Sequence, residues 1–299
     1  MTEQPLVSVI INCYNSEKYL RETIDSLVAQ TYTNWEAVFW DNCSTDKTAE
    51  MINGYGDLRF RYFLAEKKTP LGEARNLAIE KVQGDFLCFL DSDDVWEPIF
   101  IEKCIEAILL NREVGLVYSR YLNFDSVKEW GSRGQNNDGL VSLCHLIKNY
   151  NIGMSGALVD RNVVTKNKIS FNNSFSLIED FDFFITLASL TKVYYLSKPL
   201  MRYRHHQSNL TTEGDWVHEH SLFIENAKNK EYLHDYISLF EKNLDRFKVK
   251  ELIHKGQRID ALHYIFRKGF GNVHLFRYIP ALLMNEKFFY YLGSLNKKK

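Results

Sequence analysis

The chain has 299 residues, of which 45% are hydrophobic and 25% charged, a balance that excludes a mainly disordered protein. The 37 basic and 38 acidic residues nearly cancel, so the net charge of −1 gives no indication of a nucleic-acid partner. The charge is unevenly distributed, because residues 246–299 carry 12 basic and 3 acidic residues and the rest of the chain 25 basic and 35 acidic ones. An acidic body is therefore followed by a basic C-terminal stretch.

The five cysteines are widely spaced and mostly lie among apolar neighbours. Their pattern indicates neither a disulfide framework nor a zinc site and is typical of a reducing compartment. The N-terminus lacks the basic and apolar regions of a signal peptide, and no apolar run approaches the roughly 18 residues that a membrane-spanning helix needs. We therefore expect a cytoplasmic protein that contacts a membrane only peripherally, at its inner face.

The first 125 residues alternate short apolar runs with segments of helical periodicity. This alternation is typical of βαβ units and predicts an α/β fold with a mainly parallel sheet. The expected strands are 6–11, 35–40, 59–64, 86–90 and 115–124. The expected helices are 16–30, 45–52, 72–82 and 97–110.

The regular alternation ends after this point. Residues 128–139 contain three glycines and mostly polar side chains, which predicts a mobile surface loop. Helical spacing returns at 179–190, and two strands are expected at 193–197 and 200–204, on either side of Pro199.

From Trp216 onward the sequence pattern is helical throughout. We therefore place a domain boundary near residue 215. The sequence predicts an α/β domain at 1–215 and a helical, basic C-terminal extension at 216–299.

A cluster of acidic residues follows the apolar strand at 86–90, where Asp91, Ser92, Asp93 and Asp94 stand in succession. In open α/β sheets, ligands bind just beyond the carboxyl ends of the strands. Clustered carboxylates there repel one another unless a cation binds, and hard oxygen ligands suit Mg²⁺ or Mn²⁺. Acidic turns are also common after strands, so a solvated turn is the alternative interpretation.

Polar residues also follow the first two predicted strands. Tyr14 and Asn15 end the first strand, and Asp41 opens the polar stretch 41–46 after the second. A tyrosine ring can stack on a base, a carboxylate can accept from a base N–H, and an arginine such as Arg75, near a helix start, can bind phosphate. Singly, these residues suit an Asx turn and a solvent-facing arginine, but together they predict a nucleotide pocket.

In this order and spacing, the residues resemble the family 2 inverting glycosyltransferases with the glycosyltransferase A fold. The resemblance covers roughly residues 5–211. The segments that carry it are 7–15, 19–32, 41–46, 72–76, Asp91-Ser92-Asp93-Asp94, Glu179-Asp180 and Tyr203-Arg204-His205-His206. The resemblance implies a Rossmann-like, mainly parallel sheet flanked by helices as a nucleotide-sugar-binding catalytic domain, followed by the C-terminal helical extension.

Three positions depart from the family pattern. Asn12 stands where the family often has Pro, Cys43 where Gly is usual, and Ile178 where Gly commonly precedes the Glu-Asp pair. None of these changes removes a charged group of the predicted site. Cys43 bears on the geometry of its loop, because Gly tolerates backbone angles that Cys resists.

The resemblance implies that a sugar is transferred with inversion from a nucleotide-sugar donor, expected to be a UDP-sugar. The acceptor would be a hydroxyl of a glycan or of a lipid-linked sugar in polysaccharide or glycoconjugate biosynthesis, and the cofactor Mn²⁺ or Mg²⁺. Asp93 would hold the metal. The residues placed at the nucleotide by the resemblance are Tyr14, Asn15, Asp41, Arg75, Asp91 and Ser92.

Asp180 is the predicted general base. The family places its catalytic carboxylate there, and adjacent acids opening an apolar helix are costly unless they are used. A helix N-terminal acid favoured by the helix dipole is the alternative. Glu179 is predicted to support the base or contact the acceptor, and His206 to contact the diphosphate or complete the metal shell; a solvated loop histidine is the alternative for His206.

Aromatic and basic residues are interleaved between Phe240 and Tyr291, and the chain ends in three lysines. This mixture suits an amphipathic helix at an anionic membrane surface, where a lipid-linked acceptor is available. A helical cap with a solvated charged face is the alternative.

Two other functions stay open at this level. A sugar-phosphate nucleotidyltransferase usually needs a Gly-rich N-terminal loop, which residues 7–15 lack. A catalytically silent nucleotide-sugar-binding scaffold would not need the carboxylates of Asp93 and Asp180.

Overall fold

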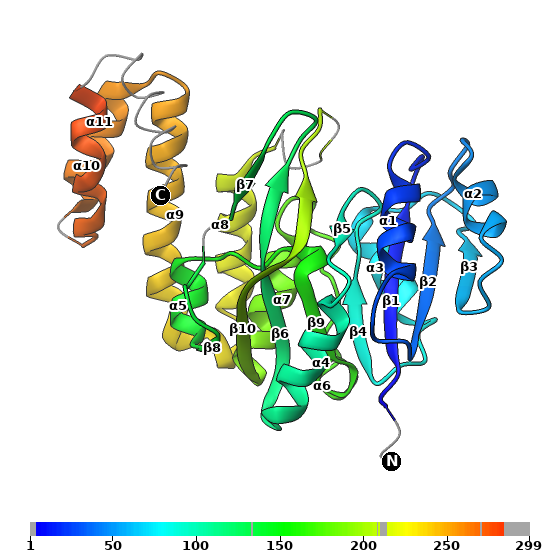
Figure 1. The fold of residues 1–299 in the computed structure, drawn as a ribbon. Coiled ribbons are helices and arrows are strands. Elements are labelled where there is room, and N and C mark those ends of the chain that lie inside the picture. The colour runs from blue at the N-terminus through cyan, green and yellow to red at the C-terminus, as the bar shows by residue number, and fades with distance from the viewer. Residues whose placement is uncertain (1–3, 133, 208, 210–213, 270, 284–299) are drawn as a thin grey trace. The chain divides into compact units, whose positions relative to one another are not determined.

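The computed structural model describes residues 4–132, 134–207, 209, 214–269 and 271–283 (Figure 1). The chain divides into two compact units, unit 1 (Met1–Glu213) and unit 2 (Gly214–Lys299). Within the described ranges, every helix is too short or too polar to cross a membrane.

The first half of unit 1 alternates strands and helices, as predicted. The strands are β1 (Val7–Cys13), β2 (Trp35–Asp41), β3 (Phe60–Leu64) and β4 (Phe86–Phe89). The helices are α1 (Leu20–Val28), α2 (Thr48–Gly54), α3 (Leu71–Ile79) and α4 (Phe100–Leu110). All residues of β2 and β4 are buried, which explains why β4 reads as a continuous apolar run and β2 as a mostly apolar one rather than as alternating strands.

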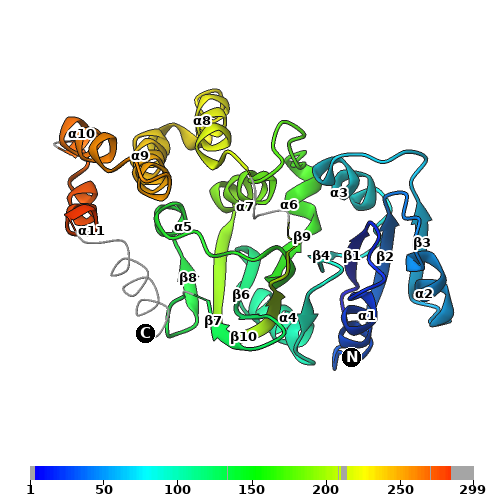
Figure 2. The same cartoon turned by 90° about the horizontal axis from the view of Figure 1, so that it is seen from above.

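The second half of unit 1 is less regular. Its strands are β5 (Val95–Trp96), β6 (Val114–Phe124), β7 (Glu129–Gly131), β8 (Gly139–Val141), β9 (Ala157–Asp160) and β10 (Lys192–Arg204). Its helices are α5 (Leu143–Lys148), the 3-10 turn η1 (Met154–Gly156), α6 (Arg161–Lys166) and α7 (Glu179–Leu190). Figure 2 shows α1 and α4 against one face of the sheet and α3, α6 and α7 against the other.

The sheet of unit 1 is mixed but mainly parallel in its first half, with the strand order β3-β2-β1-β4-β9-β6-β10-β5. β1 pairs in parallel with β2 and β4, and β2 with β3. β9 runs antiparallel to both β4 and β6, and β6 is parallel to β10. Two reversals restore the original direction, so β6 and β10 end at the same edge of the sheet as β1, β2 and β4.

Two predictions for this part of the chain were wrong. The strands expected on either side of Pro199 form one strand, β10, whose pairing with β6 shifts register before and after Pro199. Proline cannot donate to a strand ladder, so the irregularity falls where the sequence suggested a break. The loop expected over 128–139 contains β7 and the first residue of β8, which pair with β6 and β10. Both strands have only three residues, which is too few to show an apolar alternation.

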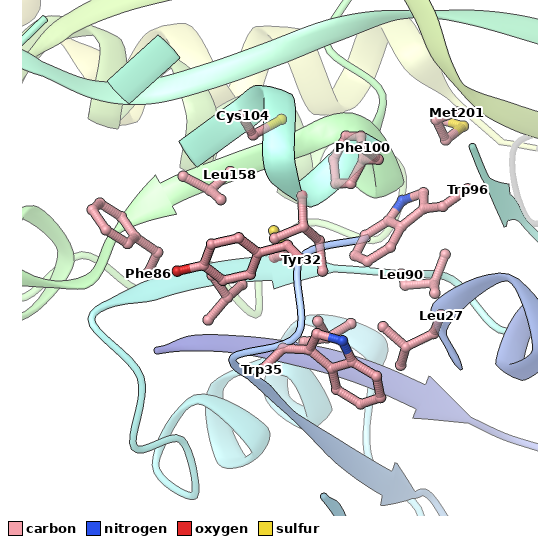
Figure 3. Packing of buried hydrophobic residues seen from close by; sticks show 14 of the residues in the cluster. Leu27, Tyr32, Trp35, Phe86, Leu90, Trp96, Phe100, Cys104, Leu158 and Met201 are labelled. Carbon is pink, nitrogen blue, oxygen red and sulfur yellow. The ribbon is translucent and has the colours of Figure 1, made fainter. Parts of the chain in front are cut away.

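A large apolar cluster lies between the sheet and helices α1 and α4 (Figure 3). Trp96 and Phe100 stack with their ring centres 4.3 Å apart, and Trp35 is almost completely buried. Because the cluster joins β4 to the residues just after the acidic segment, it anchors the loop that carries Asp91 to Asp94.

Unit 2 is helical throughout its described residues, as predicted. Its elements are α8 (Trp216–Ala227), the 3-10 helix η3 (Glu231–Tyr236), α9 (Ile237–His254), α10 (Arg258–Gly269), the 3-10 helix η4 (Val273–Tyr278) and α11 (Ile279–Leu283). A small core joins α9, α10, η4 and α11. Its buried members are Val249, Ala261, Ile265, Leu275 and Leu282.

Gly84 offers a test of the packing between β1 and β4. A Cβ atom at this position would lie 2.7 Å from the carbonyl oxygen of Leu6 and from the backbone nitrogen of Ser8, so backbone would have to move. We expect Gly84→Ala to lower the free energy of unfolding of unit 1 by about 1–3 kcal/mol. Urea unfolding followed by tryptophan fluorescence measures this change, because four of the five tryptophans belong to unit 1.

Gly54→Ala is the matched control, since a Cβ atom at Gly54 meets nothing within 4 Å. We expect this control to leave the unfolding midpoint unchanged or to raise it slightly. Equal destabilisation by the two substitutions would contradict the packing argument.

Candidate functional site

The predicted site residues gather at the edge of the sheet where β1, β2 and β4 end. The loops after β1 and β4 meet, because the hydroxyl oxygens of Ser16 and Ser92 lie 2.8 Å apart. The loops after β1 and β2 also meet, through a hydrogen bond of 2.9 Å from the Asn15 N–H to Ser44 Oγ. One continuous polar surface therefore spans the ends of three strands.

Asn15 and Asp41 shape the loops on which they lie. Asn15 Oδ1 accepts from the backbone N–H of Thr45 at 2.8 Å. Asp41 is buried, and its two oxygens accept from the Ser44 N–H and the Tyr62 hydroxyl, each at 2.7 Å. Asn15 and Asp41, which the sequence predicts to bind a nucleotide, therefore also hold these loops in place through hydrogen bonds.

The backbone of this region is left-handed at two positions. The φ angles are +49° at Asn15 and +69° at Cys43. Asn adopts this conformation readily, whereas a residue such as Cys pays a steric cost that Gly does not. The departure from the family pattern at Cys43 therefore falls at a position where glycine would be relaxed.

Tyr14 presents its ring to solvent, with 46% of the residue exposed. The Lys68 ammonium lies 3.6 Å from the centre of that ring. Lys68 is held there by its neighbour Thr69, which exchanges two hydrogen bonds with the Asn42 side chain. Lys68 could not be singled out from the sequence, since an exposed lysine in a polar loop carries no distinguishing signal.

Arg75 is buried between two carboxylates. Its Nη1 donates to Glu179 Oε1 at 2.8 Å and its Nη2 to Asp91 Oδ1 at 3.1 Å. The guanidinium therefore joins α3, the loop after β4 and the start of α7. Its two terminal nitrogens bind protein carboxylates, whereas the sequence analysis expected it to approach a nucleotide.

The acid pair at the start of α7 lies in an environment that opposes ionisation. Burial raises the pKa of Asp180 to about 6 and that of Glu179 to about 7, while the charge of Arg75 acts against both shifts. The Tyr150 hydroxyl lies 3.4 Å from Asp180 Oδ2 and donates toward it. Two carboxyls that titrate near neutral pH therefore adjoin the Arg75–Asp91 ion pair.

Asp93 and His206 form a second linked pair, with His206 Nε2 2.8 Å from Asp93 Oδ2. The His206 ring also stacks on Tyr19, with 4.9 Å between ring centres. Burial and the neighbouring Asp91 raise the pKa of Asp93, and His206 opposes the shift. The two residues lie 113 positions apart in the chain, and the end of β10 brings His206 to Asp93.

This pair has the chemistry of a partial cation site. A carboxylate oxygen and an imidazole nitrogen are both ligands that Mn²⁺ accepts, and such ions usually take part of their shell from substrate phosphates and water. Across the described residues there is no group of three or more His, Cys, Asp or Glu side chains that could hold a metal by themselves. The residues thus fit an ion that is shared with a bound diphosphate.

The structure brings together all ten predicted site residues at one sheet edge, in three linked groups. They are Tyr14–Asn15–Asp41–Ser92, Arg75–Asp91–Glu179–Asp180 and Asp93–His206. Ser155, Tyr150 and Arg204 also contact these groups. Ser155 and Tyr150 come from an irregular segment without a motif, so the sequence offered no signal for them.

The chain is similar in sequence and in fold to known proteins. The family model described as "Glycosyl transferase family 2" matches residues 8–169. The chain is 36% identical over 120 residues to the putative teichuronic acid biosynthesis glycosyltransferase TuaG of Bacillus subtilis, covering 40% of this chain and 47% of TuaG. It is 32% identical over 168 residues to an Escherichia coli protein, covering 56% of this chain and 64% of that protein. The E. coli protein is named UDP-Glc:alpha-D-GlcNAc-diphosphoundecaprenol beta-1,3-glucosyltransferase WfgD.

Among solved structures, S. aureus TarS 1-349 in complex with UDP-GlcNAc matches with a TM-score of 0.69 and 20% identity. The match covers 82% of this chain and 72% of TarS 1-349, and it shows that the two proteins share a fold. The chain spans about half of TuaG and about two thirds of WfgD. Because the family model covers more than half of the chain, the protein belongs to glycosyl transferase family 2.

Proposed function

We propose that the protein is an inverting glycosyltransferase that moves a sugar from a UDP-sugar to a hydroxyl of a glycan or lipid-linked acceptor, with Mn²⁺ or Mg²⁺ as cofactor. The observation that carries the proposal is the convergence of the Asp93–His206 pair and the Arg75–Asp91–Glu179–Asp180 group at one sheet edge. The name of WfgD, with a UDP-sugar donor and a diphosphoundecaprenol-linked acceptor, supports this choice of substrates.

Asp93 and His206 are the residues that would hold the cation. The pair is partly accessible, with 26% of the Asp93 side chain and 14% of the His206 side chain exposed. When bound, the ion neutralises charge that develops on the departing diphosphate. Tyr14 and Ser92 line the same edge on the side where the nucleoside would bind.

Asp180 is the group that would take the proton of the acceptor hydroxyl. A general base works best when its pKa lies near the working pH, and burial brings the pKa of Asp180 to about 6. Glu179 holds Arg75 through Oε1, and Arg75 in turn holds Asp91. In this scheme Glu179 and Arg75 position the base relative to the donor side of the site.

A donor assay tests the proposal. Purified protein with UDP-sugars should release UDP slowly when Mn²⁺ is added, and chelation by EDTA should stop the release. Asp93→Ala should reduce the Mn²⁺-dependent rate at least about tenfold. Loss of even a residue that supports a metal ligand typically lowers metal affinity about 10–100-fold. Asp25→Ala is the control, since Asp25 lies on α1 and bonds the Tyr55 hydroxyl.

Donor binding without hydrolysis or transfer to any acceptor would instead favour a nucleotide-sugar-binding scaffold. Formation of a nucleotide sugar from a sugar phosphate and a nucleoside triphosphate would favour a nucleotidyltransferase. Either result contradicts the proposed transfer.

The pH dependence of kcat/KM tests the assignment of the base. Asp180 must be ionised to accept a proton, so kcat/KM should rise with pH and level off above an apparent pKa of about 6. Asp180→Asn should lower kcat by about 10²–10⁴-fold and remove this rise of kcat/KM with pH. If Asp180→Asn leaves both kcat and this pH dependence unchanged, another residue is the base.

We also propose that unit 2 binds an anionic membrane surface, at the cytoplasmic face where a lipid-linked acceptor would be met. Helix α10 buries Ala261 and Ile265 in the small core of unit 2, yet it exposes 70% of Ile259 and 56% of Phe266. At about 100° per residue, Ile259 and Phe266 share one face, roughly opposite Ala261. Residues 246–283 contain eight basic and two acidic residues, which complements anionic headgroups.

Vesicle flotation of the full chain tests the membrane proposal. Binding to phosphatidylcholine vesicles should become detectable when phosphatidylglycerol is added, and Ile259→Ser with Phe266→Ser should reduce it at least about tenfold, because burial of each apolar side chain contributes 1 kcal/mol or more. Leu58→Ser with Leu110→Ser removes two exposed apolar side chains from unit 1 and serves as the control. Equal binding to neutral and anionic vesicles, or equal binding of the two double variants, refutes the proposal.

A further inference from the structure

Asp94 differs from the other acids of the 91–94 segment because it is almost completely buried, with only 1% exposed. Its Oδ2 accepts from the Ser155 hydroxyl at 2.6 Å, and its Oδ1 accepts from the backbone N–H of Arg204 at 3.0 Å. Burial of a carboxylate is costly unless its oxygens are bonded, so these two partners account for its presence. Asp94 is placed to act on protein groups rather than on a ligand.

Ser155 connects Asp94 back to the start of the acidic segment. The Ser155 hydroxyl oxygen accepts from the backbone N–H of Asp91 at 3.0 Å while its hydrogen goes to Asp94. The Ser155 carbonyl accepts from the indole N–H of Trp96, which belongs to the apolar cluster of unit 1. The turn is therefore closed on itself through η1 and fixed to the core.

Arg204 connects Asp94 to the end of β10. Besides its backbone bond to Asp94, Arg204 donates through Nε to the Asp93 carbonyl oxygen at 2.8 Å. Its guanidinium also pairs with Glu22 and lies 4.6 Å from the centre of the Tyr19 ring. The end of β10 is therefore held against the acidic turn at the residue two places before His206.

We propose that Asp94 is a positioning residue that holds the end of β10 on the acidic turn, so that the His206 imidazole meets the Asp93 carboxylate. This inference rests on the proposed function in one respect, namely that the Asp93–His206 pair binds the cation. Both carboxylate oxygens of Asp94 bond protein groups, the Ser155 hydroxyl and the Arg204 N–H. It brings together two cation ligands that lie 113 residues apart in the chain.

Asp94→Asn is the informative substitution because it keeps the shape of the side chain. The amide oxygen can still accept from the Arg204 N–H, but the amide NH₂ faces a Ser155 hydroxyl whose hydrogen then has no acceptor. We expect UDP-dependent Mn²⁺ binding, measured by electron paramagnetic resonance of free Mn²⁺, to weaken about 10–100-fold. In metal-free protein we expect faster hydrogen exchange at the amides of residues 204–206.

Glu36→Gln is the matched control for a merely structural effect. Glu36 is also a buried carboxylate of unit 1, accepting at 2.6 Å from the Ser8 hydroxyl and at 2.6 Å from the Gln83 N–H, but it lies toward the opposite end of β2 from Asp41. We expect it to lower thermal stability as Asp94→Asn does, while Mn²⁺ binding and exchange at 204–206 keep their wild-type values.

Wild-type Mn²⁺ binding by Asp94→Asn, or unchanged exchange at 204–206, overturns the inference while the proposed function stands. Absence of UDP-dependent Mn²⁺ binding in the wild-type protein overturns the proposed function, and the inference with it. A failure of the inference is therefore read from the Asp94→Asn variant, and a failure of the proposed function from the wild-type protein.

Discussion

The arrangement of the site depends on one buried cation, the guanidinium of Arg75. Removing an arginine from water is expensive, and here the cost is offset by carboxylates on two sides, from Asp91 and Glu179. These partners come from the end of β4 and the start of α7, which the chain separates by almost ninety residues. The ion pairs thus fix the distance between the sheet edge and the helix that carries the acid pair, and loss of the cation would leave carboxylates facing one another without compensation.

The same balance of burial and charge sets the chemistry of the acid pair. Without Arg75, burial alone would push the carboxyls of Glu179 and Asp180 further toward the protonated form. Burial thus raises the pKa of Asp180 to about 6 and that of Glu179 to about 7 against the opposing charge of Arg75. Burial likewise raises the pKa of Asp93, and His206 rather than an arginine opposes the shift.

Much of the fold could be predicted from the sequence where an element buries all its side chains. β2 and β4 are such strands, and their mostly or wholly apolar sequences predict their positions to within a residue. β5 was missed because two residues are too few for a periodic pattern. β9 was missed although it is as long as β4. β7, which pairs with β6, was also missed, because its three residues are too few for a periodic pattern.

The candidate site, like the fold, could be predicted only in part. The acidic segment, the Glu-Asp pair and the histidine lie within ordered motifs, so their types and order were visible. Which of them pair was not visible, since Arg75 meets Glu179 across 104 residues and Asp94 meets Arg204 across 110. Pairings of that separation follow from strand order and from the bend of the chain through η1, neither of which leaves a local signal.

The reversed strand β9 has a consequence for how this sheet can vary. It separates two groups of parallel strands, β3-β2-β1-β4 and β6-β10, whose registers are set by their own ladders. Segments inserted or exchanged around β6, β7 and β10 leave the ladder of the first four strands untouched. The first four strands can therefore keep their pairing while the connections between the other strands change in length and sequence.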